Sequence, residues 1–161
     1  MRLFKLALIS FVILFSIITG IGLLLPSKVI VSRAVDIKAS VDTIYHYTKD
    51  LKQWKLWITS LQSSNIDNPL ETKMGKSTIR IISTTKERVE GEWVEVNGDK
   101  QLMALSIIPS NQGQAIVQWQ FEQQIKWYPW ARFSSMVNDK VIGAMMEQNL
   151  ANLKAIAENA K

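Results

Sequence analysis

The 161-residue chain contains no cysteine and only one histidine, His46. Zinc sites are built from clusters of cysteine and histidine, so this composition argues against a zinc centre. It also leaves no disulfide framework, which is compatible with an oxidising compartment but does not require one. We therefore expect neither a metal nor a cofactor.

The motifs of common catalytic machinery are also missing. The sequence has no nucleophile elbow, phosphate-binding loop, dinucleotide-binding glycine fingerprint or HExxH motif. His46 lies between two tyrosines on a predicted short helix, where only Asp42 and Asp50 are spaced to pair with it. A general acid–base histidine needs a positioned partner, so we expect His46 to pack or to lie on the surface. No catalytic residue is predicted.

Strong charge of one sign is absent as well. The chain has 19 basic and 14 acidic residues, and the excess is spread along its length. Nucleic-acid binding requires clustered basic residues, so no nucleic-acid partner is expected. The mild positive charge is compatible with an anionic lipid surface.

A long uncharged apolar run is the clearest feature that is present. Residues 6–25 contain no charge, and fourteen of the twenty are Leu, Ile, Phe or Val. A helix of this length rises about 30 Å, which matches the hydrocarbon thickness of a bilayer. Each large apolar residue favours insertion by roughly 0.3 to 0.6 kcal/mol. The run predicts one transmembrane helix.

Arg2 and Lys5 precede this run, so the positive-inside rule places the N-terminus in the cytoplasm. The rest of the chain is then extracytoplasmic, or periplasmic in a Gram-negative cell. A cleaved signal peptide is the alternative. Its only small-x-small site, Gly20 and Gly22, would leave three leucines on the mature end. We favour an uncleaved anchor over 1–26 and one domain over 27–161, which begins within about 10 Å of the bilayer.

Strand-like and helix-like periodicities follow the apolar run, separated by turn-forming residues. Residues 97–99 and 110–113 have the composition of hairpin connections. Gly91 inside a strand suggests a bulge. The predicted strands are residues 29–37, 61–66, 77–84, 87–96, 100–108 and 114–124, and the predicted helices are 41–49, 50–57 and 134–158. An antiparallel sheet covered by a long amphipathic helix is the expected arrangement.

Three stretches carry a resemblance to a known family. They are residues 31–40, the motif Asp50-Leu51-x-x-Trp54-x-x-Trp57, and the motif Gly143-x-x-x-Glu147-x-x-Leu150-x-x-Leu153-Lys154-x-x-x-Glu158. The sequence resembles the START/Bet v 1-like (SRPBCC) superfamily, and within it the polyketide cyclase/dehydrase and lipid-transport group. The resemblance implies an α+β helix-grip fold, in which a curved antiparallel sheet of about six strands wraps a long C-terminal helix. Two short helices follow the first strand of that fold.

The resemblance also implies a hydrophobic cavity between the sheet and the long helix. The alternative is a filled core, because the same aromatic and methionine residues suit both roles. The candidate cavity residues are Trp54, Trp57, Ile79, Ile81, Trp93, Met103, Leu105, Val117, Trp119, Phe121, Met145, Met146 and Leu150.

Several glutamates crowd one strand. Glu90 and Glu92 share the face opposite Trp93, so we expect them on a solvated outer surface. Glu95 falls on the Trp93 side and is the one carboxylate to examine for acid–base chemistry.

A segment rich in aromatic and basic residues precedes the last helix. Lys126, Trp127, Tyr128, Trp130 and Arg132 have the character of a membrane-interface loop. The alternative is that they pack over the end of their own domain.

Three functions are compatible with these features. The first is a membrane-tethered protein that binds a hydrophobic or lipid-like molecule. The second is a cyclase/dehydratase-type enzyme using the same cavity, which an inward acid–base pair would favour. The third is an envelope interaction module with a filled core, which a cavity below about 300 Å³ would favour.

Overall fold

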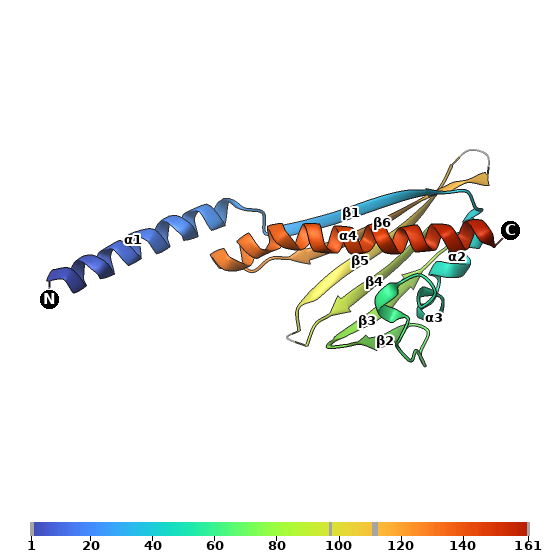
Figure 1. Cartoon of the computed structure of the whole chain (residues 1–161), viewed down its shortest axis with the longest axis horizontal. Helices are drawn as coiled ribbons and strands as arrows, with labels where there is room; N and C mark the ends of the chain where they lie inside the picture. Colours follow the sequence, from blue (N-terminus) through green and yellow to red (C-terminus); the bar gives the residue numbers. More distant parts are fainter. Residues whose placement is uncertain (1, 97, 111–112, 161) are drawn as a thin grey trace.

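The computed structural model describes residues 2–96, 98–110 and 113–160, with the backbone alone for 133–139. An extended N-terminal helix leads into a curved sheet that holds a long C-terminal helix (Figure 1). In chain order the elements are α1 (Arg2–Leu24), β1 (Lys28–Ile37), α2 (Val41–Thr48), α3 (Leu51–Trp54), the 3-10 turn η1 (Thr59–Leu61), β2 (Glu71–Met74), β3 (Ser77–Thr84), β4 (Arg88–Val94), β5 (Lys100–Pro109), β6 (Ala115–Gln124) and α4 (Pro129–Asn159).

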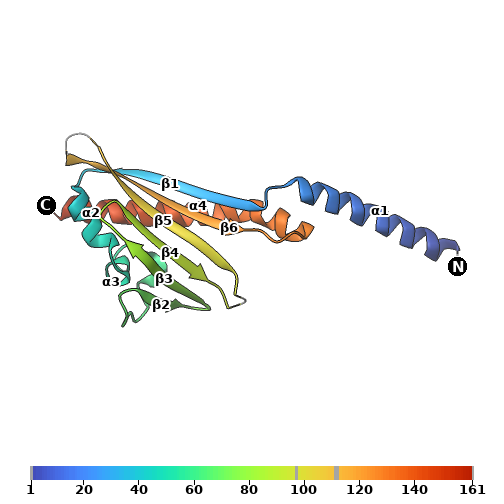
Figure 2. The same cartoon turned by 180° about the vertical axis from the view of Figure 1, so that it is seen from behind.

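The six strands form one antiparallel sheet in the order β1-β6-β5-β4-β3-β2. Viewed from behind, α4 runs along the hollow side of this sheet, close to β1 (Figure 2). The short helices α2 and α3 close the end of the sheet near the C-terminus (Figure 1). This arrangement confirms the predicted α+β helix-grip fold.

Alternating residues build the inner face of the sheet. On β6, Ala115, Val117, Trp119 and Phe121 are buried, because successive side chains of a strand point to opposite faces. The predicted strand 77–84 coincides with β3. The alternation therefore located the core side of the sheet correctly.

Arg33 is the polar exception on the inner face of β1. Its Nε donates to Glu147 Oε1 on α4 at 2.6 Å. The guanidinium lies so close to Gly143 that a Cβ there would overlap it. The lack of a side chain at Gly143 thus leaves room for Arg33 to cross the surface of α4 at this point.

Side-chain caps begin the two short helices. Ser40 accepts a hydrogen bond from the Thr43 amide at 3.2 Å, and Asp50 accepts one from the Gln53 amide at 2.9 Å. These contacts satisfy amides that have no partner within the helix. The predicted second helix or turn, 50–57, is helical only over Leu51–Trp54 and continues as a turn.

One predicted strand and one predicted helix boundary are wrong. Residues 61–66 form no strand, although Leu61 and Ile66 are buried in the core. The strand β2 lies later, at Glu71–Met74. The long helix begins at Pro129 rather than at residue 134. Proline suits the first helical position because the amide it lacks would have no partner there.

The predicted bulge lies on the neighbouring strand. The register between β3 and β4 shifts between Ile81 and Ser83, whereas Gly91 stays paired with Ile81 and Met103. A Cβ at Gly91 would lie 2.6 Å from the carbonyl oxygen of Arg80. Gly91 therefore allows β4 to pack closely against the backbone of β3. Asn97, Asn111 and Gln112 of the two predicted hairpin connections lie outside the described residues.

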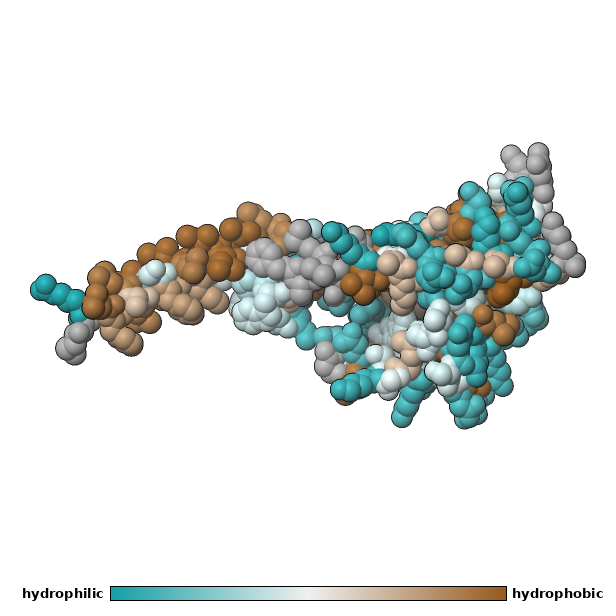
Figure 3. Space-filling model, viewed as in Figure 1, coloured by the Kyte–Doolittle hydropathy of each residue, from teal (hydrophilic) through white to brown (hydrophobic). Residues whose placement is uncertain are grey.

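The helix α1 projects from the domain and is apolar over most of its surface (Figure 3). Its length and composition are sufficient to cross a membrane, a property shared by signal sequences near the N-terminus. Near its C-terminal end α1 meets the domain, where Gly22 packs against Pro129. Arg132 donates a hydrogen bond to the carbonyl of Leu25, which ties the end of α1 to the start of α4.

Candidate hydrophobic groove

An apolar groove of about 240 Å³ lies between the sheet and α4. Trp93 and Phe121 form its sheet wall, with ring centroids 5.4 Å apart. Ile142 and Met145 form its helix wall, because they are one turn apart and share a face of α4. The groove is lined by Met74, Ser77, Trp93, Glu95, Gln101, Phe121, Ile142 and Met145.

Polar groups occur at the rim of the groove. Gln101 donates from Nε2 to Glu95 Oε1 at 3.2 Å, and both side chains are half-buried. Among the described residues that line the groove, Glu95 is the only titratable one. This described lining therefore offers an apolar wall with one carboxylate and no second acid or base.

The interior beyond the groove is filled by tryptophans. Trp54, Trp57 and Trp119 are almost completely buried, and the ring centroids of Trp57 and Trp119 are 5.5 Å apart. Trp54 Nε1 donates to the Thr48 carbonyl at 2.7 Å, and Trp57 Nε1 donates to the Tyr47 carbonyl at 2.9 Å. These bonds hold the rings in place, and none of the three tryptophans lines the groove.

The thirteen predicted cavity residues fall into two groups, those that line the groove and those that pack in the interior. All of them belong to the hydrophobic core or pack against it. Trp93, Phe121 and Met145 line the groove. The other ten pack in the interior away from the groove lining: Trp54, Trp57, Ile79, Ile81, Met103, Leu105, Val117, Trp119, Met146 and Leu150.

Five residues that line the groove are missing from the cavity residues predicted from the sequence. Met74 and Ser77 flank the β2–β3 turn, which the sequence pattern did not locate because β2 is short and polar. Gln101 carries no apolar signal. Ile142 and Glu95 did have a signal, namely the helical stripe and the position on the Trp93 side of the strand.

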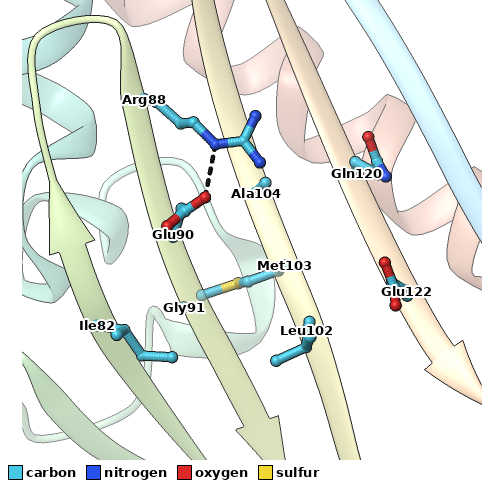
Figure 4. A pocket seen from close by; sticks show the side chains of 9 residues that line it. All are labelled: Ile82, Arg88, Glu90, Gly91, Leu102, Met103, Ala104, Gln120 and Glu122. Carbon is cyan, nitrogen blue, oxygen red and sulfur yellow. Dashed lines mark hydrogen bonds and ion pairs between the residues drawn. The ribbon is translucent and has the colours of Figure 1, made fainter.

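The outer face of the sheet carries a second hollow, of about 200 Å³ (Figure 4). Arg88 Nε pairs there with Glu90 Oε1 at 2.7 Å. Glu92 lies on the same face, as predicted, but it is nearly buried between Arg80 and Lys100. These carboxylates are engaged in ion pairs, so they stabilise the sheet surface.

His46 is not among the described residues that line the groove. His46 is exposed and lies with its ring edge near Tyr47. Among the described residues, no cluster of three or more histidine, cysteine, aspartate or glutamate side chains is arranged to hold a metal.

The segment of the predicted membrane contact lies beside the end of α1. Trp127 and Trp130 are about two-thirds exposed, and Tyr128 stacks on Trp130 with a centroid distance of 4.7 Å. Lys126 is exposed and bonds to Asp99 at 3.0 Å. The hydrogen bond and the charge of Asp99 raise the pKa of Lys126.

Arg132 differs from its predicted role. It is buried, and its guanidinium donates to the backbone carbonyls of Leu25 and Lys126. Its charge therefore serves the junction between α1 and α4 and is not presented to a lipid surface.

Comparison with known proteins identifies the family. Residues 28–158 match the family model described as polyketide cyclase / dehydrase and lipid transport. The chain belongs to this family. Its members bind hydrophobic ligands or act as cyclases. No curated protein matches the sequence significantly.

Solved structures with the same fold are distant in sequence. A START superfamily protein from Mycobacterium smegmatis is 18% identical, with a TM-score of 0.59 over 82% of this chain and 99% of that one. Norcoclaurine synthase from Thalictrum flavum, in complex with dopamine and hydroxybenzaldehyde, is 9% identical, with a TM-score of 0.61 over 88% and 92%. The di-domain ARO/CYC protein StfQ from the steffimycin pathway is 13% identical, with a TM-score of 0.59 over 82% of this chain, which spans only 51% of StfQ. At these identities the likeness establishes the fold alone.

Proposed function

We propose that this chain is a membrane-tethered binding protein that holds part of one hydrophobic or lipid-like molecule in the groove between the sheet and α4. The observation that carries this proposal is an apolar groove whose rim lies at the α1 end of the sheet. Trp93, Phe121, Ile142 and Met145 give it a wall of large apolar side chains. Covering such surface with an apolar ligand is favourable by about 25 cal/mol per Å².

The size of the groove limits how the ligand is held. Its volume of about 240 Å³ lies below the usual range for enclosed ligand sites, which starts near 300 Å³. We therefore expect one chain or ring of the ligand to enter while the rest stays outside. The ligand is then an amphiphile, with its polar part beside Glu95 and Gln101 at the rim.

Residues 1–26 serve as the anchor in this proposal, and residues 27–161 form the binding domain on the extracytoplasmic side. The uncharged part of α1 after Lys5 and the basic residues Arg2 and Lys5 before it support this topology. Protease added to intact spheroplasts should digest the domain. Protection of the domain, or a mature N-terminus after residue 20, would contradict the anchored topology.

The exposed aromatics at the start of α4 support a position of the domain against the lipid headgroups. Trp127 and Trp130 lie beside the last turn of α1, where an interfacial tryptophan keeps its ring at the apolar boundary and its N–H near polar partners. Because the groove opens at this same end, the ligand enters from the membrane side.

An interaction module with a filled core is the second candidate. The tryptophan-filled half of the interior and the small groove favour it. A cyclase or dehydratase reaction has less support, because Glu95 has no acid–base partner among the described residues that line the groove.

A groove-filling substitution separates binding from the filled-core alternative. Met145→Trp places a large ring in the groove, whereas Val141→Trp adds the same ring to an exposed position of α4. With the full chain in detergent micelles, a dansyl-labelled undecanoic acid should bind the wild type and the Val141 variant, and lose at least tenfold in affinity for the Met145 variant. Equal binding by all three proteins, or binding by none, would contradict the proposed function.

A further inference from the structure

The groove has a second rim, formed by two turns on the side opposite the start of α4. In β1 and β6, Lys28 pairs with Gln124, so the α1 junction marks one end of the sheet. Following the register across the sheet, Gln123 pairs with Gln101, Gln101 with Trp93, and Val94 with Thr78. The β2–β3 and β4–β5 turns therefore lie at the α1 end, as Figures 1 and 2 both show.

These turns border the groove directly. Ser77 and Glu95 line the groove, and the same two residues line a shallow hollow between the turns together with Lys76 and Val96. Any surface that covers the turns therefore also covers the groove mouth.

The chemistry of these turns is that of an interfacial contact. Val96 is 78% exposed, although an isolated apolar side chain gains nothing from water at that position. Lys73 and Lys76 are exposed, and within the described part of the chain neither forms an ion pair. An apolar tip beside unpaired lysines fits a surface that combines hydrocarbon with phosphate groups.

Three contacts hold the β4–β5 turn at a fixed place relative to α1, and the pairing of β3 with β4 carries the β2–β3 turn with it. Lys126 on the β6–α4 segment bonds to Asp99 in the β4–β5 turn. Arg132 joins the start of α4 to the end of α1 through the Leu25 carbonyl, and Pro129 packs on Gly22. If α1 crosses the bilayer, these contacts leave the turns facing the same bilayer.

We propose that the β2–β3 and β4–β5 turns dock on an anionic bilayer through Val96, Lys73 and Lys76, so that the groove mouth lies between two membrane contacts. This inference rests on the proposed anchor and deepens the proposed function. The ligand then passes between bilayer and groove without crossing water, so it is an amphiphile that partitions into membranes.

The chain has no cysteine, so a single introduced cysteine carries a polarity-sensitive label without background. Val96→Cys labels the docking turn, and Glu87→Cys labels an exposed position in the turn at the opposite end of the sheet. Each full-length variant, labelled with the fluorophore NBD, is reconstituted in vesicles of phosphatidylcholine alone, or of phosphatidylcholine and phosphatidylglycerol in equal parts. The NBD at position 96 should gain intensity and be quenched by nitroxide lipids only in the anionic vesicles, whereas the NBD at position 87 should change in neither.

The lysines are tested on the Val96→Cys background. Lys73→Glu with Lys76→Glu should remove about half or more of the intensity gain, because each lysine contributes separately to attraction by an anionic surface. Lys38→Glu with Lys52→Glu makes the same charge change at exposed positions in the other half of the domain and should leave the gain unchanged. If both double variants reduce the intensity gain equally, Lys73 and Lys76 have no specific role in docking.

A label at position 96 that stays in water, or that enters neutral vesicles equally well, overturns the docking proposal. Binding of the dansyl fatty acid is measured in matched vesicles with the unlabelled chain. If the chain still binds the fatty acid while the label at position 96 stays in water, only the docking proposal is refuted. If the label enters the bilayer but the chain does not bind the fatty acid, only the ligand-binding function is refuted.

Discussion

The two ends of the interior differ although both are built from aromatic side chains on the same face of the sheet. At the far end, Trp119 is enclosed by Trp54 and Trp57, which α3 and the turn after it fold over the sheet. At the α1 end, Trp93 and Phe121 face Ile142 and Met145 in the middle of α4, and a groove remains. A tryptophan thus stabilises the fold where another element covers it and offers a binding wall where none does.

The largest effect should come from the filled end. Trp119→Ala should lower the free energy of unfolding by about 3–5 kcal/mol, because a large buried ring leaves a cavity. Trp93→Ala should cost only about 1 kcal/mol, since its ring is half-buried beside the groove. Urea unfolding followed by circular dichroism gives both values.

Trp119→Phe is the matched control for this comparison. It keeps an aromatic ring and removes an N–H that has no partner among the described residues. It should cost clearly less than Trp119→Ala. Similar losses at positions 119 and 93 would show that the two ends are packed alike.

A smaller effect is expected at the border between the two ends. Gly91→Ala would bring a methyl group against the Arg80 carbonyl and the end of Met103. We expect a loss of about 1–3 kcal/mol, typical of overpacking beside backbone that cannot yield. Gly20→Ala is the control, because nothing lies within 4 Å of a Cβ there. Thermal unfolding gives the stability of both variants. Equal stability of the Gly91 and Gly20 variants would show that the packing around Gly91 is looser than the structure indicates.

The exposed aromatics should affect membrane affinity and leave stability nearly unchanged. Replacing Trp127, Tyr128 and Trp130 by serine should weaken binding of residues 27–161 to anionic vesicles about tenfold, or ~1.4 kcal/mol. Vesicle co-sedimentation gives the affinity, and circular dichroism first verifies that the truncated chain is folded. If the triple variant unfolds, these aromatics belong to the core.

The smallest expected effect is the pH dependence of the Lys126–Asp99 contact. Because the pKa of Lys126 is raised in the folded state, the contact stabilises the fold fully below the ordinary lysine value of about 10.4. This contribution is lost as the pH rises through the raised value. Lys126→Met should therefore be slightly less stable than the wild type at pH 8 and indistinguishable from it once the lysine is neutral, as urea titrations at both pH values would show.

The sequence allowed the sheet and its inner face to be predicted, because alternation on β6 and β3 follows directly from strand geometry. It also predicted the long amphipathic helix that covers the sheet. It did not reveal β2, whose four residues Glu71–Met74 carry no apolar alternation.

The division of the interior could not be predicted for a physical reason. Trp93 on β4 and Trp119 on β6 are the same residue type, and both occupy inner positions of their strands. The alternation pattern therefore predicts the same environment for both. Their environments depend on where α3 and its following turn fold over the sheet, which is a long-range contact. For the same reason Arg132, which looked like a surface cation, proved to bind the Leu25 carbonyl.

The most direct test of the account is native mass spectrometry of the full chain released from membranes in mild detergent. Wild-type protein and the Val141→Trp variant should carry one amphiphile per chain, and the Met145→Trp variant should carry none. An equal mass for all three proteins with no adduct, or the same adduct on the Met145 variant, would contradict the claim that the groove at the α1 end binds a membrane-derived ligand.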